Sequence, residues 1–107
     1  MIQATYYRSY NRLTVTGHAR SAEPGKDLVC AAASILAYTL AANVANMADN
    51  GQVRQPVIKT DKGDAEISCN PRHNIKASVT LIFDTVCAGF ELLAHDYPEY
   101  IKYEIRA

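Results

Sequence analysis

The sequence predicts a two-layer α+β domain, with two helices packed on one face of a mostly antiparallel sheet of about five strands. Two long segments repeat apolar residues at the three- and four-residue spacing of amphipathic helices. Short runs rich in β-branched and aromatic residues flank these segments, and turn-forming residues divide the runs into hairpins. We therefore expect the order ββαββαβ, although the order of the strands within the sheet cannot be read from the sequence.

The first two strands are expected at Ile2 to Arg8 and Leu13 to Gly17. Both runs are rich in Tyr, Thr and Val, and the polar residues 9–12 separate them as in a hairpin. Alternation in the second run places its apolar side chains on one face, and His18 is then expected to project from the other.

The first helix is expected from Leu28 to Ala48. The preceding residues 20–26 include Pro24 and Gly25 and lack apolar periodicity, which is typical of a loop. Asp27 is a good N-cap for the helix, and Asn50-Gly51 supplies its C-terminal stop.

The second half of the chain repeats this pattern. Strands at Val57 to Thr60 and Ala65 to Cys69 flank a turn at residues 61–64, which predicts a second hairpin. Apolar residues from Val79 to Ala94 mark the second helix, and Ile101 to Ile105 alternate as a last strand.

Size and composition indicate one domain, residues 1–107, in the cytoplasm. The chain is 49% hydrophobic and 21% charged, and its apolar runs are too short to span a membrane. The N-terminus lacks the pattern of a signal peptide, and three cysteines are an odd number for a disulfide framework. We therefore expect free thiols and no membrane location.

The charge balance argues against a nucleic-acid ligand. Eleven basic and eleven acidic residues give no net charge, and no basic cluster occurs. Because nucleic-acid binding requires cations that neutralise phosphates, we expect a peptide or protein as the partner.

A histidine and a cysteine lie where nucleophilic chemistry can use them. His18 ends the second strand, and Cys30 is expected at the third position of the first helix. A cysteine nucleophile needs a base or a positive field to hold the thiolate, and His18 and the helix N-terminus can supply one each. Periodicity alone also allows a solvent-exposed His18 and a core Cys30.

The residues around this pair form a longer motif. It consists of Gly17-His18-Ala19, a short loop, and then Gly25, Asp27, Val29-Cys30-Ala31-Ala32 and Ser34 at fixed spacing. The motif resembles the signature of the ribosomal-processing cysteine proteases of bacteria, the Prp family. The likeness extends to the chain length, the order of elements and the closing segment Tyr97 to Ile101, so it covers nearly the whole chain.

The resemblance implies a cysteine endopeptidase without a cofactor, with Cys30 as the nucleophile and His18 as the general base. It also implies a substrate: the N-terminal extension of large-subunit ribosomal protein twenty-seven, cut after paired phenylalanines. Members of the family form homodimers and can process phage proteins, so a homodimer is expected here and phage structural proteins are an alternative substrate.

Three supporting roles remain open at this stage. Asp27 is either the N-cap of the helix or a third triad member that orients His18. Ser34 lies one turn after Cys30, where the resemblance implies a site residue, but its hydroxyl could instead bond the carbonyl four residues back. Because a cap at Asp27 would occupy the Cys30 amide, we look to backbone amides near Gly17, Gly25 or Lys26 for oxyanion donors.

Other functional classes are less consistent with the sequence. A ribosome-associated module that binds the same peptide without cutting it is the main alternative, and a cysteine hydrolase acting on a small molecule or thioester is another. Cys69 and His73 provide only two possible zinc ligands, so no metal site is expected. Cys87 falls on the apolar stripe of the second helix, and His95 suits the C-terminus of that helix.

Overall fold

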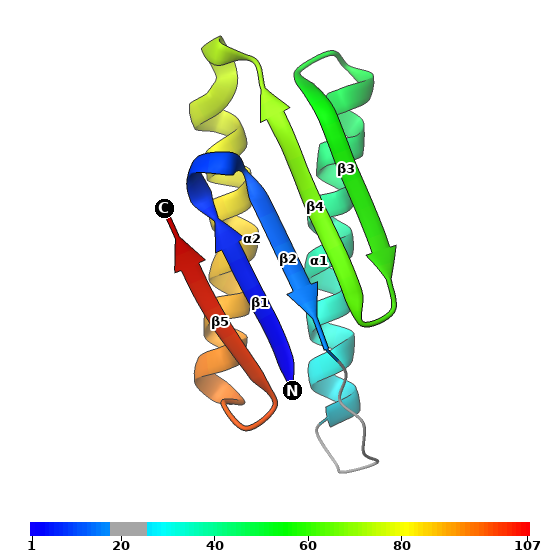
Figure 1. Cartoon of the computed structure of the whole chain (residues 1–107), viewed down its shortest axis with the longest axis vertical. Coiled ribbons are helices and arrows are strands. Elements are labelled where there is room, and N and C mark those ends of the chain that lie inside the picture. The colour runs from blue at the N-terminus through cyan, green and yellow to red at the C-terminus, as the bar shows by residue number, and fades with distance from the viewer. Residues whose placement is uncertain (18–25) are drawn as a thin grey trace.

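The computed structural model describes residues 1–17 and 26–107, and the backbone but not the side chains of Lys26 and Asp27. The described residues form two α-helices and five strands in the predicted order ββαββαβ, together with two single-turn 3₁₀ helices, which confirms the fold class. Both helices cover the same face of one sheet (Figure 1). The strand order, which the sequence left open, is β3-β4-β2-β1-β5.

Two hairpins and a final strand build the sheet. Strands β1 (Ile2–Tyr7) and β2 (Arg12–Thr16) pair antiparallel, as do β3 (Val53–Asp61) and β4 (Asp64–Pro71). Strand β4 also pairs antiparallel with β2, which joins the two hairpins. Strand β5 (Ile101–Arg106) runs parallel to β1, so the sheet is mixed but mostly antiparallel, as expected.

Strand β3 is longer than the predicted run Val57 to Thr60. Pro56 lies within the longer strand, although proline cannot donate a hydrogen bond to a β-ladder. In the structure the register shifts between Arg54 and Val57, and Gln55 takes a left-handed conformation with φ of 50°. This bulge lets β3 continue past Pro56 at the edge of the sheet, where a missing donor is tolerated.

The helices fill the space behind the sheet. Helix α1 spans Lys26–Asp49 and helix α2 spans Lys76–Asp96, each a few residues longer than predicted. By length and composition alone both could cross a membrane, but each packs a buried face into the core. The largest fully buried side chains join the two layers: Tyr6, Leu13, Leu40, Ile67, Phe83 and Phe90.

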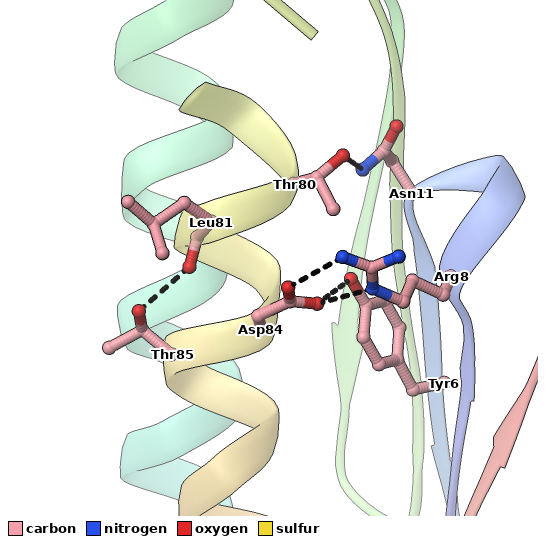
Figure 2. Close-up of polar contacts among 7 residues, drawn as sticks. All are labelled: Tyr6, Arg8, Asn11, Thr80, Leu81, Asp84 and Thr85. Atoms are coloured by element: carbon pink, nitrogen blue, oxygen red, sulfur yellow. Dashed lines mark hydrogen bonds and ion pairs between the residues drawn. The ribbon is translucent and has the colours of Figure 1, made fainter. Parts of the chain in front are cut away.

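A polar cluster fixes α2 to the turn end of the first hairpin, away from the N-terminus of α1 (Figures 1 and 2). The buried Tyr6 donates its hydroxyl hydrogen to Asp84 Oδ1 at 2.8 Å. Arg8 donates from Nε and Nη2 to both carboxylate oxygens of Asp84, each at 3.0 Å. Asn11, also buried, donates from Nδ2 to the Thr80 hydroxyl at 3.1 Å. This cluster sets the position of α2 against the sheet.

Candidate active site

A pocket of about 150 Å³ opens between the N-terminal half of α1 and the turn that joins β3 to β4. Its helical wall carries Cys30, Ser34 and Tyr38, and the opposite wall is the turn, residues 60–65. The floor is apolar and is formed by Ile2, Val15, Ala33, Ala37 and Ala65. The pocket thus places a thiol and a hydroxyl beside a surface that suits an apolar side chain.

Cys30 is partly exposed in this pocket and packs on the core from the edge. The sequence predicted Cys30 as the third residue of this helix. Helix α1 begins at Lys26, however, so Cys30 is its fifth residue. Its N–H therefore falls within the regular helical pattern, opposite the Lys26 carbonyl. The amide of Cys30 is thus still unsuitable as an oxyanion donor, but because of the helix itself and not because of a cap.

The earlier helix start also changes the electrostatic setting of Cys30. The field of a helix N-terminus falls off within the first turn, and Cys30 lies beyond that turn. The helix dipole alone therefore supplies less stabilisation to a thiolate than the sequence suggested. A base next to Cys30 becomes correspondingly more important.

Ser34 lies one turn after Cys30 and lines the same pocket. Two other helical hydroxyls bond the carbonyl four residues back: Thr39 to Ile35 at 2.6 Å and Thr85 to Leu81 at 2.7 Å, the latter drawn in Figure 2. Within the described part of the chain, Ser34 makes no such bond and has no other hydrogen-bond partner. Its hydroxyl is therefore available to a molecule in the pocket.

Gly17 lines the pocket at the end of β2 and immediately precedes His18 in the sequence. Its φ of 101° suits only glycine, and a Cβ there would lie 2.1 Å from the Met1 carbonyl oxygen. The Gly17 N–H donates to the Gly63 carbonyl at 3.0 Å. This amide is already engaged, so the suggestion that Gly17 itself donates to an oxyanion is not supported by the structure.

A family model described as cysteine protease Prp matches residues 1–102. The chain belongs to this family. It is accordingly a cysteine-type peptidase, as the motif around Cys30 predicted. No curated protein sequence matches the chain.

Solved structures share the fold of the Prp family over almost the full chain. SMU.848 from Streptococcus mutans is 29% identical with a TM-score of 0.64, and the match covers 99% of this chain and 94% of that one. The ribosomal processing protease Prp from S. aureus in complex with a substrate peptide is 20% identical with a TM-score of 0.63, covering 98% and 97%. The same protease with a covalently linked product peptide is 22% identical, with the same TM-score and coverage.

Several predicted site residues of the Prp motif lie outside the described structure. These are His18, Gly25 and the side chain of Asp27. The backbone of Asp27 lies within the first turn of α1, one residue after its start and not ahead of it. With α1 beginning at Lys26, Asp27 does not precede the helix as its N-cap. The assignments of His18 as the base and of Asp27 as a triad member stay predictions.

The turn between β3 and β4 and the ring of Tyr38 are pocket residues that sequence reasoning missed. The hairpin itself was predicted, but no residue in it signals a site. Its contribution depends on β4 lying next to β2, which brings residues 60–65 opposite α1. Tyr38 follows Cys30 by eight residues and was not distinguished by the helical pattern.

The other cysteines are poor nucleophiles. Burial raises the pKa of the Cys69 thiol to about 11. Burial also raises the pKa of Cys87 to about 12, although its hydrogen bond with Tyr103 acts in the opposite direction. Among the described residues, no three His, Cys, Asp or Glu side chains group as a metal site requires. Cys30 is thus the cysteine suited to chemistry.

Proposed function

We propose that this protein removes the N-terminal extension of large-subunit ribosomal protein twenty-seven by cutting after an aromatic pair. The observation that carries the proposal is the placement of Cys30 and Ser34 beside a pocket of about 150 Å³ with an apolar floor. An engineered cavity of about this volume binds benzene, so the pocket matches one aromatic side chain. The S. aureus Prp structures, with a substrate peptide and with a covalently linked product peptide, support a peptide substrate and a covalent intermediate.

The reaction follows the usual course of a cysteine peptidase. His18 accepts the Cys30 proton, and the thiolate sulfur attacks the carbonyl carbon of the scissile peptide bond. The carbon–nitrogen bond then breaks as His18 returns the proton to the leaving amine, which leaves a thioester on Cys30. Water, deprotonated by His18, attacks the thioester, and the thiol departs with a proton and releases the new carboxylate.

Ser34 supports this chemistry from the next turn of the helix. Its unengaged hydroxyl can donate to an oxygen of the bound peptide, because it lies on the same wall of the pocket as the thiol. Hydrogen bonds aimed at the developing oxyanion are a main source of stabilisation in acyl transfer.

Peptide cleavage followed by mass spectrometry tests the proposal. A peptide that carries the expected extension should give two fragments, with the cut after the aromatic pair, and replacing the aromatic residue before the cut by Ala should abolish cleavage. Cys30→Ala should be inactive, while Cys69→Ala, a matched change at a buried cysteine, should retain activity. Binding of an uncut peptide by the wild-type protein would favour a binding module, and cleavage only of a phage protein peptide would favour the alternative substrate.

We also propose that the protein works as a homodimer in the cytoplasm. All three cysteines are free, which suits a reducing compartment. Among the described side chains, the exposed positions of the two helices include an uncharged, mostly apolar set, and the exposed charged residues lie at Asp49 of α1 and at Lys76, Glu91 and Asp96 of α2. The uncharged positions are Leu28, Ala31, Ile35, Tyr38 and Ala42 of α1 and Leu81, Thr85, Ala88 and Leu92 of α2. Exposed apolar patches of this extent mark interaction surfaces.

The dimensions of this helical face fit a second copy of the chain. The helices form one broad side of the molecule, which extends 45 by 23 Å (Figure 1). That face is larger than the roughly 800 Å² that each partner buries in a standard interface. Sedimentation analysis should give a dimer for the wild type and a monomer for Ile35→Glu, which places a charge at a position 61% exposed. A monomeric wild type would contradict the dimer.

A further inference from the structure

The turn between β3 and β4 is attached directly to the strand end that leads to His18. In the β2–β4 ladder Thr16 pairs with Asp64, and the bond from Gly17 N–H to the Gly63 carbonyl continues this ladder by one residue. The ladder therefore runs into the turn itself. Any displacement of the turn is passed to Gly17 through this bond.

Gly17 has little freedom to absorb such a displacement. Its backbone lies so close to Met1 that an added Cβ would clash with the Met1 carbonyl, so Gly17 cannot move toward the start of β1. The Met1 carbonyl packs against Gly17 on one side, and the hydrogen bond to the Gly63 carbonyl fixes it on the other. The position of Gly17 is thus determined by the turn and by the start of β1.

Gly63 is the residue of the turn that allows this geometry. Gly63 has a φ of 78°, whereas the φ of Lys62 is not positive. This combination is typical of a type II turn with Gly63 as its second central residue. The turn is also closed by an ion pair between Lys59 Nζ and Asp64 Oδ2 at 2.7 Å. A β-branched residue at position 63 would oppose the left-handed conformation, whereas asparagine tolerates it.

We propose that Gly63 is a positioning residue for peptide cleavage. Its carbonyl fixes Gly17, and through Gly17 it sets both the point where the chain leads into His18 and the width of the pocket opposite Cys30. This inference rests on the proposed function. A misplacement of about 1 Å at a catalytic group can reduce the rate by about 10²-fold, so the turn can affect catalysis without touching the reacting atoms.

The test compares glycines in equivalent conformations at opposite ends of the molecule. Gly51 follows α1 with φ of 71°, and a Cβ there meets nothing within 4 Å. The variants Gly63→Val and Gly51→Val therefore carry the same kind of backbone strain, but only the first disturbs the bond to Gly17. Peptide cleavage is measured for both, at a temperature at which each variant is folded.

We expect Gly63→Val to lower kcat about 10- to 100-fold, with a smaller change in KM, and Gly51→Val to remain within about threefold of the wild type. Gly63→Asn should restore kcat because asparagine accepts the left-handed conformation. If Gly63→Val does not fold, Gly63→Ala is assessed in the same way. Equal kcat values for the variants at positions 63 and 51 would overturn the proposal.

A second measurement separates this inference from the proposed function. The rate at which iodoacetamide alkylates Cys30 reports on the surroundings of the thiol without any peptide. We expect its dependence on pH to change in Gly63→Val and not in Gly51→Val. If the wild type cleaves no peptide, the proposed function fails, and this comparison still decides the positioning role. Identical alkylation profiles for the two variants would refute that role.

Discussion

Replacing Asp84 by Ala should destabilise the fold through the loss of a partly buried hydrogen bond. Tyr6 is 1% exposed, and its hydroxyl has Asp84 as its acceptor at 2.8 Å. Without the carboxylate, the hydroxyl is left unpaired in the core, which costs about 1–3 kcal/mol. Arg8 also loses its partner, but this pair is exposed to solvent and contributes little.

The size of the effect can be measured by urea unfolding followed by circular dichroism. Thermal unfolding provides a second measurement, because in a domain of this size a loss of about 1 kcal/mol in unfolding free energy lowers the Tm by about 4 °C. Asp84→Asn keeps an oxygen acceptor for Tyr6 and should cost less than Asp84→Ala. In a Tyr6→Phe background the donor is absent, so Asp84→Ala should then cost little. An equal cost of Asp84→Ala with and without the Tyr6 hydroxyl would refute the reasoning.

The same carboxylate predicts a dependence of stability on pH. Hydrogen bonds from Arg8, and to a smaller extent from Tyr6, hold the pKa of Asp84 below its usual range. A carboxyl with a depressed pKa in the folded state stabilises the fold above its unfolded pKa of about 3.9, and this contribution is lost as the pH falls through the folded value. The difference in unfolding free energy between wild type and Asp84→Asn should therefore shrink below about pH 4. A constant difference between pH 6 and pH 3 would contradict this assignment.

Three further predictions concern the site. His18→Ala should lower kcat about 10²- to 10⁴-fold and remove the acidic limb of the pH–rate profile, which steady-state kinetics over a pH series would detect. Ser34→Ala should lower kcat/KM roughly two- to tenfold through the loss of one hydrogen bond, with unchanged thermal unfolding; an unaltered kcat/KM would remove Ser34 from the site. Iodoacetamide should modify Cys30 alone in the native protein at neutral pH, because burial keeps the thiols of Cys69 and Cys87 protonated. Mass spectrometry should show one adduct under native conditions and three after denaturation, and modification of Cys69 or Cys87 before Cys30 would contradict the prediction.

The element order could be predicted because each helix and most strands carry their own periodic pattern. Val29, Leu40 and Val44 recur at helical spacing, and all three are fully buried in the structure. The boundaries were less certain because local signals compete. Asp27 is a favourable cap, yet it is also compatible with the first turn of a helix, where α1 includes it. Pro56 is a strand breaker that an edge bulge accommodates.

The second wall of the pocket could not be predicted, because it depends on strand order. Cys30 and Ser34 follow from the motif, since they lie on one helix at a spacing of one turn. Gly63 contributes only because β4 pairs with β2, and this long-range pairing leaves no pattern in the residues around the turn. The helical side of the site could therefore be predicted from the sequence, and the turn opposite it could not.

The parallel pairing of β1 with β5 affects how the chain can fold during synthesis. Ile2 lies opposite Ile101, so β1 gains its second neighbour only after β5 has been made. Contacts between distant residues slow folding because a long loop must close before they form. Until then β1 is an open sheet edge, to which another chain could add. The residues that line the pocket, by contrast, end at Ala65 in β4, so they can meet while α2 and β5 are still being added.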